Sequence, residues 1–171
     1  MTTMTLTAER SDLLESLGVA RFFLRNTARG LTDEQARLRP TASELTLGGL
    51  IKHVSDIEHG WARFVTEGPA AVAPPGSEDG YAEWANGFKM LEGETLSGLL
   101  QRYEEIAAQT DDLVRTCDLD ASHELPPAPW FTPGARRSAR RAFTHIIAET
   151  AQHAGHADII RESIDGQKSM G

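Results

Sequence analysis

Three residues near the end of the chain have the types and the spacing of metal ligands. His145, Glu149 and His153 follow one another at intervals of four, and His156 comes three residues later. Residues at these intervals share one face of a helix. Neutral imidazole and carboxylate groups both bind zinc. The spacing therefore indicates that Glu149 and His153 can hold one divalent metal ion together.

A metal ion needs at least one further ligand from another part of the chain, and His53 is the best candidate. Leu50 and Ile57 lie near it at helical intervals, which places His53 beside an apolar face. His59 lies among charged residues and is expected to be exposed. The structural alternative is a hydrogen-bonded core histidine together with a solvated Glu/His pair, which spacing alone does not exclude.

Apolar residues recurring every three or four positions predict the helices that must position these side chains. Thr46 and Ser138 are suited to begin two of them, and Gly166 to end the last. Gly48 and Gly49 weaken the first turn of the second long helix, which indicates the close approach of another backbone. The expected long helices span 8–28, 46–66, 95–116 and 138–164.

The connections between these helices are rich in proline and glycine, and strand signals are weak throughout. A capping box at Thr32 and Gln35 predicts a short helix near 33–38. Another short helical turn is expected over 81–90, with Trp84 and Phe88 facing inward. The connection over 67–94 is long enough to cross the bundle. We therefore expect a single all-α domain over 1–171, folded as a four-helix bundle. The expected order is up-down-down-up, with a long crossover between the second and third helices, rather than the simple up-down-up-down order.

The composition of the chain limits the kinds of molecule that it is expected to bind. The formal net charge is −8, which disfavours nucleic-acid binding. Positive charge gathers only at Arg136, Arg137, Arg140 and Arg141, either as a solvated first turn of a helix or as a receptor for one anionic ligand. The single cysteine, Cys117, permits no intrachain disulfide. With no membrane-spanning run and no signal peptide in the sequence, the expected location is cytoplasmic.

Two stretches make the sequence similar to the DinB-like proteins. Leu45–His53 (LTLGGLIKH) resembles their second helix, and Glu149–Asp158 (ETAQHAGHAD) resembles their last. The branch with glutamate and then histidine in the last helix includes mycothiol-dependent maleylpyruvate isomerase and the mycothiol S-transferases, and 159–166 is typical of it. The resemblance implies a metal site formed by His53, Glu149 and His153 in an up-down-down-up four-helix bundle that is often a homodimer.

The resemblance also implies a chemistry. Three protein ligands leave one coordination position open, as in catalytic zinc sites. A thiol that enters this position would lose its proton and could attack an electrophile. We therefore expect a zinc-dependent transferase of a small-molecule thiol, mycothiol by resemblance, with nickel or ferrous iron as alternative metals. Cys117 lies among aspartates and is a poor alternative nucleophile.

Three other functions remain open at this point: hydrolysis by metal-bound water, iron-dependent oxygen chemistry, and a non-enzymatic metal-binding stress-response protein. His145 and His156 are candidates for orienting a ligand or the substrate. The same positioning role could fall to Asp56, Glu58 or Asp158. Four aromatic residues in the long connections, Trp84, Phe88, Trp130 and Phe131, either line a pocket or cap the core.

Overall fold

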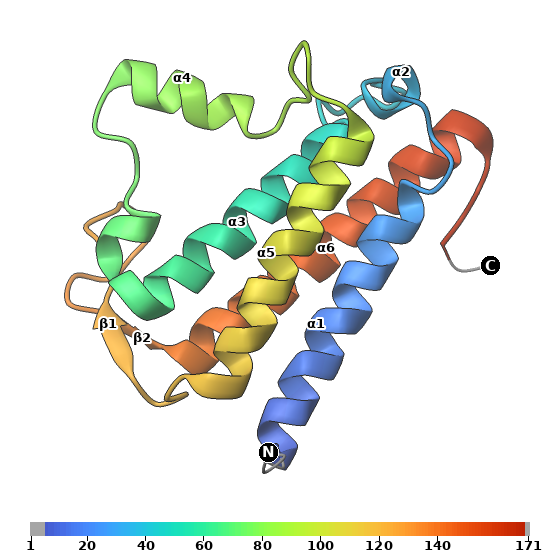
Figure 1. Cartoon of the computed structure of the whole chain (residues 1–171). Coiled ribbons are helices and arrows are strands. Elements are labelled where there is room, and N and C mark those ends of the chain that lie inside the picture. Colours follow the sequence, from blue (N-terminus) through green and yellow to red (C-terminus); the bar gives the residue numbers. More distant parts are fainter. Residues whose placement is uncertain (1–5, 170–171) are drawn as a thin grey trace.

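Four long helices form the body of the protein, whose computed structural model describes residues 6–169. Figure 1 shows these helices lying side by side, with the short elements at their ends and along one flank. The long helices are α1 (Ala8–Thr27), α3 (Leu47–Glu67), α5 (Leu96–Thr116) and α6 (Ala139–Asp165). The short elements are α2 (Asp33–Ala36), the 3₁₀-helix η1 (Pro69–Val72), α4 (Glu78–Asn86) and the strands β1 (Ser122–Glu124) and β2 (Arg136–Ser138).

Side-chain caps begin the helices where the sequence predicts them. The hydroxyl of Thr46 accepts a hydrogen bond from Gly49 N, and that of Ser138 accepts one from Arg141 N. Gly166 ends α6 with φ 78°, a left-handed conformation that glycine adopts without steric cost. The predicted bounds of the four long helices are confirmed to within one residue.

The close backbone approach predicted at the start of the second long helix is confirmed. A Cβ atom at Gly49 would lie 2.0 Å from the carbonyl oxygen of Phe88. At Gly48 it would lie 3.2 Å from the carbonyl oxygen of Ala36. Gly49 therefore lets the connection that follows α4 pack directly on α3, and Gly48 does the same for the end of α2.

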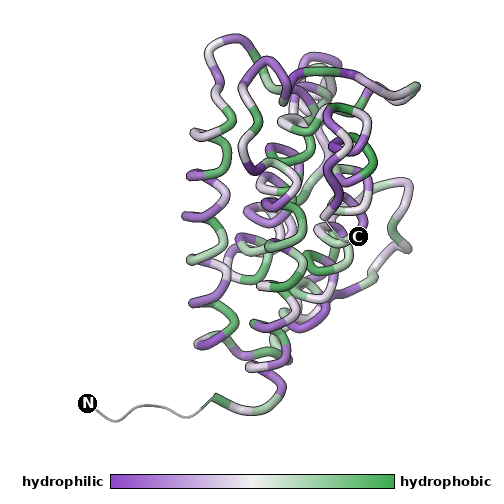
Figure 2. The backbone as a smooth tube through the Cα atoms, turned by 90° about the vertical axis from the view of Figure 1, so that its right-hand side faces the viewer, coloured by the Kyte–Doolittle hydropathy of each residue, from purple (hydrophilic) through white to green (hydrophobic). Residues whose placement is uncertain are grey.

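Apolar stripes from the long helices form two clusters of core residues. One cluster includes Leu50 and Val54 of α3 with Ala157 of α6, and the other includes Phe64 of α3 with Phe143 of α6. Helix α3 packs against both α5 and α6, and α1 packs against α6. Figure 2 shows hydrophilic and hydrophobic residues alternating along the helices, as amphipathic helices around a shared core require. Among the helices of residues 6–169, none combines the length and hydropathy that a bilayer span requires.

The connection between α3 and α5 differs from its prediction in two respects. Its short helix begins earlier, because the hydroxyl of Ser77 caps α4 by accepting from Gly80 N. Trp84 exposes 54% of its surface, so the expectation that it faces inward is wrong. The reason is that α4 lies apart from the bodies of the long helices in Figure 1. Phe88 does face inward, where it is half-buried.

The short strands β1 and β2 were not expected. They pair antiparallel, with Ser122 opposite Ser138 and Glu124 opposite Arg136. Each strand has only three residues, and a proline-rich segment separates them. Such short strands carry no period of their own, because the pairing partner rather than local sequence determines that they form.

Candidate metal centre and adjoining cleft

His53 of α3 and two residues of α6, Glu149 and His153, converge between the two helices. One potential ligand atom from each lies within 4.8 Å of those of the other two. His153 Nε2 lies 3.6 Å from Glu149 Oε2. His59, on the same helix as His53, does not take part in this group of residues. The structure therefore brings together the three side chains that the sequence selected.

Burial keeps the two imidazoles of this group neutral at pH 7. His53 is only 8% exposed, and burial, aided by the nearby His153, lowers its pKa to about 4. Burial and the neighbouring His156 also lower the pKa of His153. Neutral imidazole is the form that binds metal ions. Two neutral nitrogen donors and one carboxylate thus fit a divalent cation such as zinc.

Three further side chains contact the group and restrict its geometry. His156 Nδ1 lies 3.3 Å from His153 Nδ1, so a hydrogen bond between them directs His153 Nε2 toward Glu149. His145 Nε2 lies 3.7 Å from Glu149 Oε1. The ring of Phe88 stacks on His53 with 3.8 Å between centroids and an interplanar angle of 20°. His145 and His156 therefore occupy the places from which they could orient the two ligands of α6.

The acidic residues considered for the same positioning role have other partners. Glu58 is fully buried and forms an ion pair of 2.5 Å with Arg21. Asp56 accepts a hydrogen bond of 2.6 Å from Arg102. Asp158 accepts one of 2.6 Å from the backbone N–H of Ser169. Their side chains are thus occupied away from His53 and His153.

A cleft of about 690 Å³ opens beside the group of His53, Glu149 and His153. Its walls come from α3, α4, α6, the strand β2 and the connections that follow α3 and β1. The lining includes His53 and Glu149, further polar side chains and several aromatic rings, namely Asp56, Glu83, Arg137, His145, Trp61, Tyr81, Trp84, Trp130 and Phe131. The cleft therefore gives a small molecule access to the candidate ligands.

Of the four aromatic residues considered in the two long connections, Trp84, Trp130 and Phe131 line this cleft, and Phe88 stacks on His53 instead. Trp84 and Trp130 are 54% and 61% exposed, which rules out a core-capping role for both. Phe131 lines the cleft while also packing against the core. Trp61 is one cleft residue that the sequence did not indicate, because its helical spacing is that of the buried stripe of α3. It is 5% exposed and still lines the cleft.

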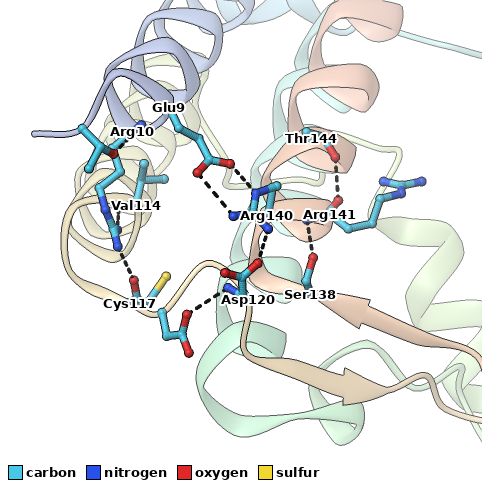
Figure 3. A network of polar contacts seen from close by, with 11 residues as sticks. Glu9, Arg10, Val114, Cys117, Asp120, Ser138, Arg140, Arg141 and Thr144 are labelled. Atoms are coloured by element: carbon cyan, nitrogen blue, oxygen red, sulfur yellow. Dashed lines mark hydrogen bonds and ion pairs between the residues drawn. The ribbon is translucent and has the colours of Figure 1, made fainter.

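The four clustered arginines have different environments. Arg136 and Arg137 belong to β2, so the expectation of a single solvated helical turn is wrong for them. Figure 3 shows Arg140 between the carboxylates of Glu9 and Asp120, and it bonds to both. Arg137 alone of the four lines the cleft.

Cys117 also appears in Figure 3, where its backbone carbonyl accepts a hydrogen bond of 2.8 Å from Arg10. Its thiol is half-buried, and burial, aided by the charge of Asp118, raises its pKa despite the nearby Arg10. A thiol with a raised pKa is a weak nucleophile at neutral pH. Cys117 does not line the cleft beside the candidate ligands.

Comparisons with known proteins assign the chain to a protein family. The family model described as "Mycothiol-S-transferase" matches residues 12–166. No curated protein matches the chain. Among solved structures, a conserved protein from Enterococcus faecalis is similar with a TM-score of 0.64 at 17% identity, over 92% of this chain and 97% of that one. At this identity the likeness concerns the fold alone.

Proposed function

Because this chain belongs to the mycothiol-S-transferase family, we propose that it transfers a low-molecular-weight thiol, mycothiol by family, to an electrophile with the help of a divalent metal ion. His53, Glu149 and His153 would hold the metal, for which zinc is the first choice. The observation that carries the proposal is the convergence of these three side chains within 4.8 Å at the edge of an open cleft.

A bound divalent cation would lower the pKa of a thiol that enters its coordination sphere. The residues of the chain supply the rest. His53 and His153 present neutral nitrogen atoms, and the hydrogen bond between His156 and His153 fixes which nitrogen faces Glu149. Phe88 covers one face of His53 and keeps water away from it. The cleft receives the electrophile.

We also infer that residues 1–171 form one domain with the up-down-down-up order expected from the sequence. Support comes from the packing of α3 against both α5 and α6. In Figure 1, α3 and α5 begin at the end of the molecule where α1 and α6 finish. The connection through α4 then carries the chain back along the length of α3.

The test of this function is the thiol-dependent consumption of an activated aryl halide by the zinc-loaded protein. The thiol sulfur forms a bond to the aryl carbon, halide leaves, and the thiol proton passes to solvent. We expect turnover to require both thiol and metal and to stop with a chelator. His153→Ala should abolish turnover, and His59→Ala should leave it intact.

The competing functions predict different results in parallel assays of the same protein. Consumption of an ester or amide without thiol would indicate a hydrolase. Turnover that depends on oxygen and iron would indicate an iron enzyme. Metal binding without turnover of any electrophile would indicate a non-enzymatic metal-binding protein. Each of these results would contradict thiol transfer.

A further inference from the structure

We propose that Arg137 binds the carboxylate of a planar, apolar co-reactant in the cleft beside the candidate metal centre. The binding itself is independent of the proposed function. Only the statement that the bound molecule reacts rests on that function.

The first observation concerns the Nη1 atom of the Arg137 guanidinium. Its Nη1 is shielded from solvent and has no hydrogen-bond acceptor within the part of the chain that the structure describes. Its neighbours are satisfied: Arg136 bonds to Ser122, and Arg140 bonds to Glu9 and Asp120. Arg137 is otherwise only half-buried, so an anion can approach it from the cleft. A shielded N–H donor without an acceptor is costly, so an anion arriving from solvent would be stabilised there.

The second observation is the position of Arg137 relative to the candidate ligands. Its guanidinium carbon lies 4.6 Å from the ring centroid of Trp61. The other neighbours of this indole include His145, with 4.8 Å between centroids. His145 in turn lies 3.7 Å from Glu149. Arg137, Trp61, His145 and Glu149 thus follow one another along the cleft wall, and a molecule held by Arg137 at one end can reach the candidate metal centre with the other.

The lining of the cleft indicates the class of molecule. The planar fork of a guanidinium matches the two oxygens of a carboxylate. Asp56, Glu83 and Glu149 line the same cleft, so a doubly charged anion would be repelled more strongly than a monoanion. The exposed rings of Trp84 and Trp130 offer surfaces for a flat, apolar body. An aromatic monocarboxylate satisfies all these features.

Direct binding of two matched probes tests the proposal, using the full chain treated with a chelator. The probes are 4-nitrobenzoate and the neutral 4-nitrobenzamide, measured by calorimetry. We expect the original protein to prefer the carboxylate by at least about tenfold. Arg137→Gln should remove this preference, and Arg137→Lys should weaken it because the fork is lost. Arg136→Gln is the matched control and should keep it.

Four results would overturn the proposal. These are equal binding of both probes to the original protein, an unchanged preference in Arg137→Gln, a matching loss in Arg136→Gln, or carboxylate binding only when zinc is present, which would place the probe on the metal. Urea unfolding checks the folding of each variant. If Arg137→Gln does not fold, Arg137→Lys and the two-probe comparison in the original protein decide the matter.

The carboxylate could belong to the electrophile or to the thiol, and turnover with zinc distinguishes the two. Matched pairs of electrophiles and of thiols, with carboxylate or with amide, are compared. Arg137→Gln should raise KM about tenfold for whichever partner carries the carboxylate and leave its neutral analogue unchanged. If no pair turns over, the proposed function fails while probe binding still stands. If turnover occurs but Arg137 makes no difference to binding, only the present proposal fails.

Discussion

The imidazole of His53 on α3 meets that of His153 on α6 edge to face, with 4.9 Å between centroids and 84° between planes. Neither ring donates to the other, and both are kept neutral by burial. Their potential ligand atoms converge with one from Glu149. The contact between α3 and α6 thus adds His53 to the two potential ligands on α6.

The first prediction concerns metal content. His153→Ala removes one of the three donors. Loss of a residue that is only hydrogen-bonded to a metal ligand lowers metal affinity by roughly 10–100-fold, so loss of a ligand should lower zinc affinity by more than this. His59→Ala is the matched control, since His59 lies on α3 outside the group. Elemental analysis after equal zinc loading checks this prediction. Equal metal content in the two variants would contradict the assignment of ligands.

The second prediction concerns acid stability without metal. The pKa values of His53 and His145 are lowered to about 4, chiefly by burial, from an ordinary value of 6.5. The unfolded chain therefore binds more protons between these values, and the free energy of unfolding falls as pH drops below about 6.5. By pH 5 the loss should reach about 2 kcal/mol for each histidine.

Urea unfolding between pH 7 and pH 5, with a chelator present, measures this dependence. His145→Phe removes one of the three histidines whose pKa is lowered and keeps a ring against Trp61, so the loss of stability at pH 5 should shrink by about 2 kcal/mol. A variant as sensitive to acid as the original protein would show that His145 is not buried in its neutral form.

A third prediction uses the close packing at the start of α3. Gly49→Ala would place a methyl group 2.0 Å from the carbonyl oxygen of Phe88, so the connection after α4 must shift. We expect a loss of about 1–3 kcal/mol in stability. The shift should also weaken zinc binding, because Phe88 stacks on His53.

Gly155→Ala is the control for this change. Within residues 6–169, no atom other than those of the adjacent residues and the surrounding helix backbone lies within 4 Å of a Cβ at Gly155, and the residue is in α6. Alanine in a helix interior should stabilise the protein by up to about 1 kcal/mol. Thermal unfolding of both variants measures the contrast, and similar melting temperatures would show that the approach of Phe88 is not obligatory.

The fourth prediction concerns the buried ion pair between Arg21 of α1 and Glu58 of α3. Arg21→Met would leave the fully buried Glu58 without its cation and should cost about 3–5 kcal/mol. Arg25→Met breaks a more exposed pair with Glu104 and should cost less than about 1 kcal/mol. Urea unfolding measures both losses.

A double variant separates the lost partner from lost packing. Replacing Glu58 by Leu in the Arg21→Met background removes the uncompensated charge, so most of the lost stability should return. If stability does not recover, the packing of the Arg21 side chain rather than its charge supports the core.

The sequence by itself determined the long helices and the shared helix face of two of the three candidate ligands. Thr46, Ser138 and Gly166 act through hydrogen bonds and backbone conformations that involve only a few neighbouring residues. Glu149 and His153 share a face because they are one helical turn apart. Such features are local, so they can be identified without knowing where the helix packs.

Only the tertiary structure decided which distant residues meet. It brought His53 to α6 and paired two short strands. It also placed Arg137 in the cleft and Arg140 in an ion pair with Glu9, although the two arginines lie three positions apart. It also left Trp84 exposed at a cleft rather than inside the core. These outcomes depend on how the helices and connections pack against one another. The periodicity of a single segment does not predict that packing.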